Sequence, residues 1–495
     1  MKTVVNCKTM RESDRATIEG GVRSVELVKR AASAVFEYAI ERKGGFAVIC
    51  GSGNNGADGY ALTLMLADAG RECTAFSTGS RFTPECEHFR ALCMERGLVR
   101  EAIDFEPENF DNITDCLIGT GFKGSLRPDA KEIVEKINGS GKYVISVDIN
   151  SGLDSDSGRA DLCVRSNLTV AIQFAKAGHY LNDAKDMIGR LEVADTGIKL
   201  SGRAYRLIEN GDVRALLGER KQNSHKGNYG CVALIGGCAM YSGAIKLANL
   251  GAAAIKSGCG VVKLGVPATV APYVAPYLLE STLFQLADRG GALDYDPDGI
   301  DSLISNVKAC ALGMGIGRGA GVLPTLEHIL STCSLPFVID ADGLNVLAST
   351  DLSALDKTKC RVILTPHPAE FSRLTGASVD DILSDPVGVA EDFARKHNAI
   401  VLLKGCTTVI TDGEKAYLSA SGCAGMASGG SGDLLSGIIT GMLGYLPADA
   451  LTVACAAHIN GLAGEIAEKK SNPISMSAGD TASSIANAIS VILKK

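Results

Sequence analysis

The sequence reads FAVICGSGNNGADGY from Phe46 to Tyr60, an apolar run followed at once by a glycine-rich turn. A continuous apolar run is typical of a parallel strand that is buried on both faces. Glycines after such a strand let backbone N–H groups approach a phosphate. The spacing G-x-G-x-x-G is weak by itself, because an ordinary turn into a helix produces it too. A nicotinamide-dependent dehydrogenase would also need an acid at the end of the next strand, and the run Cys73–Thr78 ends without one.

Short apolar runs alternate with helical patterns along all 495 residues, which predicts an α/β protein. Gly59–Ala69 and Ala130–Ile137 are predicted as helices between strands. A charged, polar stretch at 208–226 interrupts the alternation, so we predict two domains, 1–207 and 208–495. The other predicted strands lie at 115–121, 143–149, 168–174, 231–237, 261–267, 309–315, 336–343, 362–368 and 399–405.

Composition excludes several classes of protein. The chain has 49 basic and 56 acidic residues, a net charge of −7, so it lacks the broad positive surface that binds nucleic acid or anionic membranes. Its 16 cysteines are scattered without any C-x-x-C pair, which favours buried thiols in a reducing cytosol over disulfides or zinc. The first residues lack the apolar core of a signal peptide. The apolar region Leu434–Ala463 contains Pro447 and Asp449, and we interpret it as buried helices. We therefore expect a cytoplasmic protein without membrane or nucleic acid partners.

Two further polar loops follow predicted strands in the first half. They read DCLIGTGFKGS at Asp115–Ser125 and SVDINSGLDSDSG at Ser146–Gly158. The carboxyl ends of parallel strands converge on one crevice, so these loops and the glycine-rich turn should meet there. Each acid taken alone could equally be a helix cap. Amide and carboxylate oxygens in the three loops could coordinate a cation or fix a polar ligand.

The three motifs together resemble the N-terminal YjeF family, the NAD(P)HX epimerases, over about residues 1–205. GSGNNGADG is similar to the family signature G-x-G-N-N-G-G-D-G, and DINSGLD is similar to D-I-P-S-G-L-D. Two residues depart from the pattern. Ala57 replaces a glycine and adds a methyl group near the ligand, and Asn150 replaces a proline, which is expected to loosen a turn.

The resemblance implies a Rossmann-like three-layer domain that binds hydrated NADH or NADPH (NADHX or NADPHX) and inverts one ring carbon. Inversion needs a proton donor or acceptor near the ring, and Asp148 is the candidate catalytic residue. The implied potassium ligands are Asn55, Asp115 and Ser151. The implied substrate-binding residues are Asn54, Asn55, Gly56, Ala57, Asp58, Gly119, Thr120, Gly121, Phe122, Lys123, Gly124, Ser125 and Asp148.

The second half contains the stretch ASGGSGDLLSGIITGML at Ala427–Leu443, a glycine-rich turn that runs into an apolar helix. Backbone N–H groups and the helix dipole at such a start can hold a phosphoryl group. Asp433 could accept the proton of an attacking hydroxyl, although it could also be only a helix cap. Lys404 stands at the end of a predicted strand, where its ammonium could meet phosphate.

Four elements of this half occur in the order S-H-K-G, T-P-H-P-x-E, K-G-x-x-T and G-G-S-G-D. They resemble the C-terminal YjeF family, the NAD(P)HX dehydratases, over about residues 210–495. The resemblance implies a ribokinase-like α/β fold in which ADP phosphorylates the ring hydroxyl and elimination restores NADH or NADPH, with release of AMP and phosphate. It also implies Mg²⁺ with ADP, and Asp433 as the catalytic base. The implied contacts are Ala244, Gly315, His367 and Asp433 to the hydrated cofactor, and Lys404, Gly405, Cys406, Thr407, Thr408 and Gly432 to the nucleotide.

Two other interpretations stay open. A ribokinase-like fold alone would suit a small-molecule kinase with an accessory domain. The N-terminal domain could also sense or scaffold nucleotides without turnover, which the retention of Asp148 disfavours. The preference for ADP over ATP rests on the resemblance alone. We expect a homo-oligomer.

Overall fold

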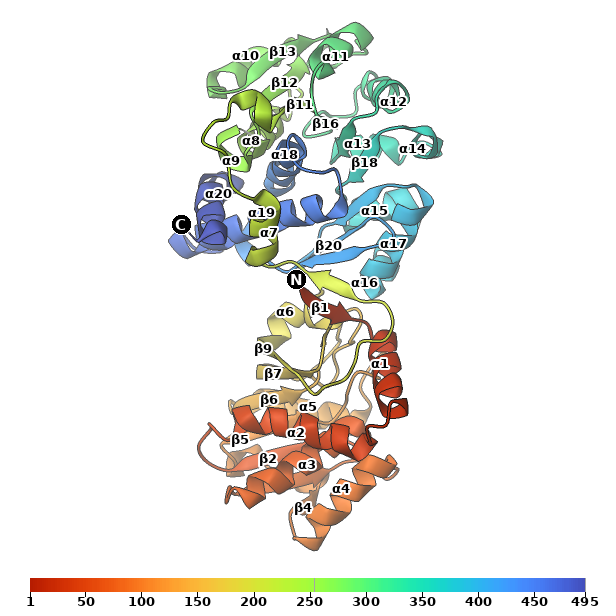
Figure 1. Ribbon diagram of the computed structural model, residues 1–495, viewed down its shortest axis with the longest axis vertical. Helices are drawn as coiled ribbons and strands as arrows, with labels where there is room; N and C mark the ends of the chain where they lie inside the picture. The colour runs from red at the N-terminus through yellow and green to blue at the C-terminus, as the bar shows by residue number, and fades with distance from the viewer. Residues whose placement is uncertain (253, 495) are drawn as a thin grey trace. The chain divides into compact units, whose positions relative to one another are not determined.

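The computed structural model describes residues 1–252 and 254–494, and it forms two compact units (Figure 1). One unit is Thr3–Tyr205, and the other is Arg206–Lys495 together with Met1–Lys2. The chain therefore passes from one unit to the other between Tyr205 and Arg206. The predicted domain boundary was between residues 207 and 208. Each unit has its own sheet and its own buried core, as described separately below.

The N-terminal unit is built on a seven-stranded sheet in the order β4-β3-β2-β5-β6-β7-β9, with every pair of neighbours parallel. Because β3 and β5 flank β2, the strand order reverses there, and ligands of such sheets bind in the crevice at this reversal. The strands are β2 (Phe46–Cys50), β3 (Cys73–Ser77), β4 (Val99–Glu101), β5 (Asn112–Cys116), β6 (Tyr143–Val147), β7 (Ser166–Ile172) and β9 (Ile188–Ala194).

Both faces of this sheet are covered by helices, and strand β2 shows why its sequence is apolar throughout. Phe46, Val48 and Cys50 pack into one core with α2 (Ser24–Ala39), α3 (Asn54–Asp68) and α4 (Pro84–Glu95). The alternate residues Ala47 and Ile49 pack into a second core with α5 (Pro128–Gly139). Successive side chains of a strand point to opposite faces, so a strand between two helical layers must be apolar at every position. The predicted three-layer domain is confirmed.

Several predicted boundaries in this unit are wrong: β6 ends at Val147 rather than Ile149, and β7 spans Ser166–Ile172 rather than 168–174. Two others bear on the site. Helix α3 begins at Asn54 rather than Gly59, so the predicted loop residues form its first turns. A methyl group added at Gly56 would lie 1.9 Å from the Gly51 carbonyl oxygen, so this glycine lets the helix start directly against the strand end. Strand β5 ends at Cys116, and 117–121, predicted as strand, instead turn over the crevice. A further helix, α1 (Cys7–Glu19), follows β1 (Lys2–Val5), which pairs in parallel with β8 (Ala175–Lys176).

The C-terminal unit contains strands in the order β13-β12-β11-β16-β17-β18-β19-β20-β21-β10. The seven from β13 to β19 are parallel, whereas β20 is antiparallel to both β19 and β21. The strands are β10 (Tyr205–Leu207), β11 (Cys231–Ile235), β12 (Val261–Pro267), β13 (Thr282–Leu286), β16 (Ala309–Leu312), β17 (Pro336–Ile339), β18 (Arg361–Leu364), β19 (Ile400–Leu403), β20 (Thr408–Thr411) and β21 (Ala416–Ser419).

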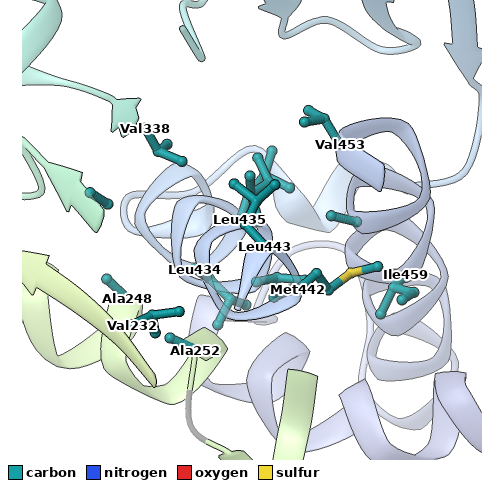
Figure 2. Packing of buried hydrophobic residues seen from close by; sticks show 14 of the residues in the cluster. Val232, Ala248, Ala252, Val338, Leu434, Leu435, Met442, Leu443, Val453 and Ile459 are labelled. Carbon is teal, nitrogen blue, oxygen red and sulfur yellow. The ribbon is translucent and has the colours of Figure 1, made fainter. Parts of the chain in front are cut away.

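Helix α18 (Ser431–Leu443) lies at the centre of the C-terminal core (Figure 2). It packs closely on α8 (Ser242–Ala252), and the glycine at 437 permits this approach. A methyl group added at Gly437 would lie only 2.0 Å from the Ala248 carbonyl oxygen. Helices α19 (Ala450–Lys470) and α20 (Ala478–Leu493) complete this layer. From β16 to β19 each strand lies beside the one before it, in the direction opposite to the step from β11 to β12. Right-handed crossovers therefore place the connecting helices on the sheet face opposite α18 (Figure 1). These helices are α12 (Val322–Thr332), α13 (Asp342–Leu347), α15 (Pro368–Thr375) and α17 (Pro386–Lys396).

The prediction that Leu434–Ala463 forms buried helices is confirmed. Helix α19 is long and apolar enough to cross a membrane by length and composition. However, 78% of its apolar window is buried inside the structure, which is the environment of a core helix.

Candidate active sites

A cavity of about 1300 Å³ opens in the N-terminal unit where β2, β5 and β6 end. It lies at the reversal of strand order, the position at which parallel α/β sheets bind ligands. Ten of the predicted substrate-binding residues line it: Asn54, Asn55, Asp58, Gly119, Thr120, Gly121, Phe122, Lys123, Ser125 and Asp148.

Three predicted substrate-binding residues do not line this cavity: Gly56, Ala57 and Gly124. Ala57 is fully buried in the core beneath α3, so its extra methyl group packs against the protein rather than near the ligand. Gly56 provides the close approach to Gly51, and Gly124 has a φ of 81°, which a loop residue without a side chain adopts readily.

Asp148, at the end of β6, is held in place by three partners. Its backbone has a φ of 66°, which is uncommon for a residue with a side chain. Its Oδ1 accepts hydrogen bonds from the Ile172 backbone N–H (3.1 Å) and from Lys176 Nζ. The Asp148 carbonyl oxygen accepts from Nε2 of His179 at 2.8 Å. Burial and the nearby Lys176 lower the pKa of His179 to about 4, so its ring is neutral and donates from Nε2 alone.

Lys176 and His179 were not predicted as site residues. Lys176 is fully buried, and a buried ammonium needs a negative partner, which Asp148 supplies. The signal in the sequence was a lysine directly after the apolar run Leu168–Phe174, where a solvent-exposed charge would be out of place.

Two more carboxyl groups line the same cavity, Asp14 on α1 and Asp58 in the first turns of α3. Burial and the charge of Asp148 raise the pKa of Asp14 to about 6. Burial, followed by Asp148 and Asp14, raises the pKa of Asp58 well above its ordinary value. Asp14 was missed because the charged segment around it, MRESDRATIEG, has the pattern of an ordinary solvated helix face.

The three predicted cation ligands form one connected cluster. The buried carboxylate of Asp115 accepts hydrogen bonds from the Ser151 hydroxyl and, at 2.9 Å, from the Ser151 backbone N–H. Ile118 joins the cluster, because its N–H donates to Ser151 Oγ at 2.8 Å and its carbonyl accepts from Asn55 Nδ2 at 3.2 Å.

This cluster has the chemistry of a cation site. Burial raises the pKa of Asp115, and its hydrogen-bond donors are neutral hydroxyl and backbone groups. Oδ1 of Asn55 is buried and has no hydrogen-bond partner. A cation would stabilise the buried negative charge of Asp115 and would give Oδ1 of Asn55 a partner. Among the described residues no group of three or more His, Cys, Asp or Glu side chains could hold a metal, so a cation here would depend on amide and hydroxyl oxygens.

Asn150, which replaces the proline of the family pattern, does not loosen its turn. Its buried amide nitrogen donates to the Val164 carbonyl oxygen (2.8 Å), Ser166 Oγ (3.0 Å) and the Met187 carbonyl oxygen (3.2 Å). Its amide oxygen accepts from Thr169 Oγ1 at 2.6 Å. The expectation of a looser turn is therefore wrong, because four hydrogen bonds replace the rigidity of a proline ring.

In the C-terminal unit the candidate site lies where β16, β17, β18 and β19 end, beside the start of α18. Asp433 is the third residue of α18, and the N-cap position belongs to Gly430, whose φ is 94°. The alternative of a simple N-cap role for Asp433 is therefore wrong. Burial and the charge of Asp340 raise the pKa of Asp433 to about 7.

Asp340 follows β17 and forms the buried centre of this site. Its carboxylate accepts from Lys404 Nζ at 3.2 Å and from Ser436 Oγ at 2.8 Å. Lys404 Nζ also lies 3.7 Å from Glu370 Oε2. Burial disfavours both charges, but their mutual attraction outweighs it: the pKa of Asp340 is lowered and that of Lys404 is raised. Asp340 was not predicted as a site residue, although an acid directly after a buried strand was the available signal.

The remaining predicted residues of this unit lie at strand ends, at the start of β20, or in the first turn of α8 or α18. Gly432 adjoins the charged pair, since a methyl group added there would lie 3.3 Å from Lys404 Nζ. Gly315 adjoins Ala244, since its added methyl group would lie 2.7 Å from Ala244 Cβ. His367 caps α15, accepting at Nδ1 from the Ala369 N–H (3.2 Å), with its side chain 48% exposed. The turn between β19 and β20 carries Gly405, Cys406 and Thr407, and Thr408 begins β20.

Models of two protein families match the chain. Residues 24–178 match the YjeF-related protein N-terminus, and residues 232–487 match NAD(P)H-hydrate dehydratase. The bifunctional NAD(P)H-hydrate repair enzyme Nnr of Moorella thermoacetica is 33% identical over 96% of this chain and 94% of its own length. The chain belongs to the family of bifunctional NAD(P)H-hydrate repair enzymes. The predicted resemblance of the first half to an epimerase and of the second half to a dehydratase is confirmed, and the two halves together match one fused family.

Solved structures support the fold of this repair enzyme's C-terminal unit. The ADP/ATP-dependent NAD(P)H-hydrate dehydratase of Bacillus subtilis, crystallised with ATP and Mg²⁺, is similar with a TM-score of 0.51 and 30% identity. The match covers 58% of this chain and 99% of the other. A ribokinase-like superfamily protein of Enterococcus faecalis is similar in fold, with a TM-score of 0.50, 21% identity, and coverage of 60% and 98%. The predicted ribokinase-like fold is confirmed.

Proposed function

We propose that the N-terminal unit interconverts the R and S hydrates of NADH and NADPH, and that the C-terminal unit dehydrates the S hydrate with ADP, releasing AMP and phosphate. The observation that carries this proposal is a cluster of carboxyl groups with a lysine at the strand ends of each unit, fully buried in the N-terminal unit and 22% exposed in the C-terminal unit. Asp148 pairs with Lys176 in one unit, and Asp340 pairs with Lys404 in the other. Both units therefore hold groups that can move protons, as two separate reactions require.

In the N-terminal unit the cavity is larger than the usual pocket for a drug-sized ligand, so it is large enough for a dinucleotide. Loop residues Gly119–Ser125 line it and would hold the phosphates, and Asp148 would accept or return a proton at the ring. Asn55, Asp115 and Ser151 would hold a potassium ion, which supplies positive charge beside the phosphates.

In the C-terminal unit Asp433 would take the proton of the ring hydroxyl while the hydroxyl oxygen attacks the terminal phosphorus of ADP. AMP leaves, and the new phosphate ester then departs as inorganic phosphate while the ring loses a proton, which restores the double bond. Lys404 and the N-terminus of α18 would stabilise the phosphoryl oxygens. Mg²⁺ bound with the nucleotide would neutralise further phosphate charge.

Several finer features of the protein stay predictions. The Bacillus subtilis relative is named for both ADP and ATP, so the preference for ADP stays a prediction. A cytoplasmic location and a homo-oligomeric state also stay predictions. The predicted contacts of His367, Ala244 and Gly315 with the hydrated cofactor rest on the resemblance and on their places at strand ends and in the first turn of α8.

The test supplies the separated R and S hydrates with ADP and with ATP to the full chain and to two variants. Asp148→Asn is expected to lose epimerisation and keep dehydration of the S hydrate, and Asp433→Asn is expected to do the reverse. Each variant is the matched control of the other, because both remove one carboxylate from the same protein. Loss of a proton-transfer group should lower the affected rate by on the order of 10²–10⁴. Accumulation of a stable phosphorylated product, visible by phosphorus NMR, would instead establish the small-molecule kinase.

A further inference from the structure

We infer that Asp14 is the second catalytic acid–base residue of the epimerase, working opposite Asp148 across the nicotinamide ring. This inference rests on the proposed epimerase function of the N-terminal unit. Nothing in the sequence motifs singles out Asp14, which lies on α1, far along the chain from the glycine-rich turn and from Asp148. Its assignment follows from where the fold places its carboxyl group.

The first observation is the position of the carboxyl groups around the cavity. Asp14, Asp58 and Asp148 reach the same cavity from three different elements, α1, α3 and the end of β6. The charge of Asp148 acts on both of the other two carboxyl groups, so the three form one electrostatic cluster. A reactant in this cavity can therefore meet more than one proton-transfer group.

The second observation is that the groups differ in what surrounds them. Asp148 accepts an N–H from Ile172 and is paired with the ammonium of Lys176, both of which stabilise its ionised form. Asp14 accepts no hydrogen bond from the described residues and faces the charge of Asp148 while half-buried. The two carboxyl groups thus differ: donors hold Asp148 in place, whereas burial and the charge of Asp148 raise the pKa of Asp14 to about 6.

Asp58 is less suited to this role. It lies in the first turns of α3, and burial, followed by both neighbouring acids, raises its pKa well above its ordinary value. A carboxyl group favoured so strongly in its protonated form is a poor base. Asp14, with a pKa raised to about 6, can lose and regain its proton under working conditions.

The chemistry requires two such groups. Water adds to an enamine double bond with its hydroxyl on the carbon next to nitrogen, and that carbon is inverted when the hydroxyl leaves one face and water returns to the other. Asp14 gives a proton to the departing hydroxyl, the C–O bond breaks, and the ring nitrogen lone pair forms an iminium. Water then attacks the opposite face and Asp148 takes its proton. Asp14 ends as a carboxylate and Asp148 as an acid, which is the state that catalyses the reverse direction.

The test compares Asp14→Asn and Asp14→Glu in the full chain, with Glu12→Gln as the matched control on the same helix outside the cavity. Asp14→Asn is expected to lower kcat for epimerisation by on the order of 10²–10⁴ with KM changed only a few-fold. Asp14→Glu is expected to recover part of this loss, because it restores a carboxyl group. Glu12→Gln is expected to epimerise like the wild type, and all three variants are expected to dehydrate the S hydrate normally.

The pH profile separates a catalytic from a structural role. Asp14 must carry a proton to protonate the departing hydroxyl, so wild-type kcat/KM should fall above a pH of about 6. Asp14→Asn should remove that alkaline limb. Wild-type kcat in Asp14→Asn, or a wild-type profile that stays flat between pH 5 and 8, would overturn the inference while leaving the epimerase function intact. Failure of the wild type to epimerise either hydrate would instead refute the function on which the inference rests.

Discussion

Asn150 offers a quantitative test of how this chain replaces a proline. In Asn150→Ala the carbonyl oxygens of Val164 and Met187 and the hydroxyl of Thr169 lose a buried partner. Each buried polar group left unsatisfied costs about 1–3 kcal/mol, and the losses are not fully additive. The expected destabilisation of the N-terminal unit is therefore about 3–5 kcal/mol. Asn150→Pro, which restores the family residue, should be no better, because its ring supplies none of these hydrogen bonds.

The assay uses the two activities as separate reporters of the two units in the full chain. Samples are heated briefly at increasing temperatures, and residual epimerase and dehydratase rates are measured. For a unit of this size 1 kcal/mol corresponds to about 2–4 °C, so the temperature of half-inactivation of the epimerase should fall by about 10 °C while that of the dehydratase stays constant. The exposed Asn109 provides the control Asn109→Ala, which should change neither. An unchanged epimerase midpoint in Asn150→Ala would refute the role assigned to the four hydrogen bonds.

Two further predictions concern the active sites. Because the pKa of Asp433 is raised to about 7 and the base must be ionised, kcat/KM for dehydration should rise about tenfold from pH 6 to pH 8, and a flat profile would contradict this role. Exchanging potassium for tetramethylammonium at constant ionic strength should slow epimerisation and lower the half-inactivation temperature of the epimerase, without effect on dehydration. An equal response in Asp115→Asn would show that Asn55, Asp115 and Ser151 do not form the cation site.

The central strands of both sheets could be predicted because their sequences carry a direct physical signal, whereas strands such as β4, β9, β13, β20 and β21 were not predicted. Phe46–Cys50 is apolar at each position since helices cover both faces, and the structure reproduces this run as β2 without shift. The start of α3 could not be read the same way. Its first turns, Asn54–Asp58, contain two amides and a glycine, which disfavour a helix locally, and only the packing of Gly56 against Gly51 shows why a helix begins there.

The motif residues of each site could be found from sequence, but the charged groups that control them could not. Asp148 and Asp433 lie in recognisable motifs, whereas Lys176 and Asp14 do not. A lone lysine after a strand and a lone aspartate on a charged helix each have a commonplace explanation in sequence. Their roles appear only when folding brings separated elements to one cavity, since a pKa depends on burial and on neighbours in space.

The two units, with different folds, arrange their acids in the same way, and this similarity explains how both can work near neutral pH. In each, a lysine forms an ion pair with one carboxylate: Lys176 pairs with Asp148, and Lys404 pairs with Asp340. Burial, followed by the charge of that carboxylate, raises the pKa of a second, half-buried acid, to about 6 for Asp14 and about 7 for Asp433. Burial alone would raise the pKa of both members and leave neither reliably charged. In each unit the lysine contacts one member only, which makes the surroundings of the two acids different. Each lysine also lowers the pKa of the second acid, so neutralising Lys176 or Lys404 should raise the pKa of Asp14 or Asp433 further and shift the pH dependence of the affected reaction upward.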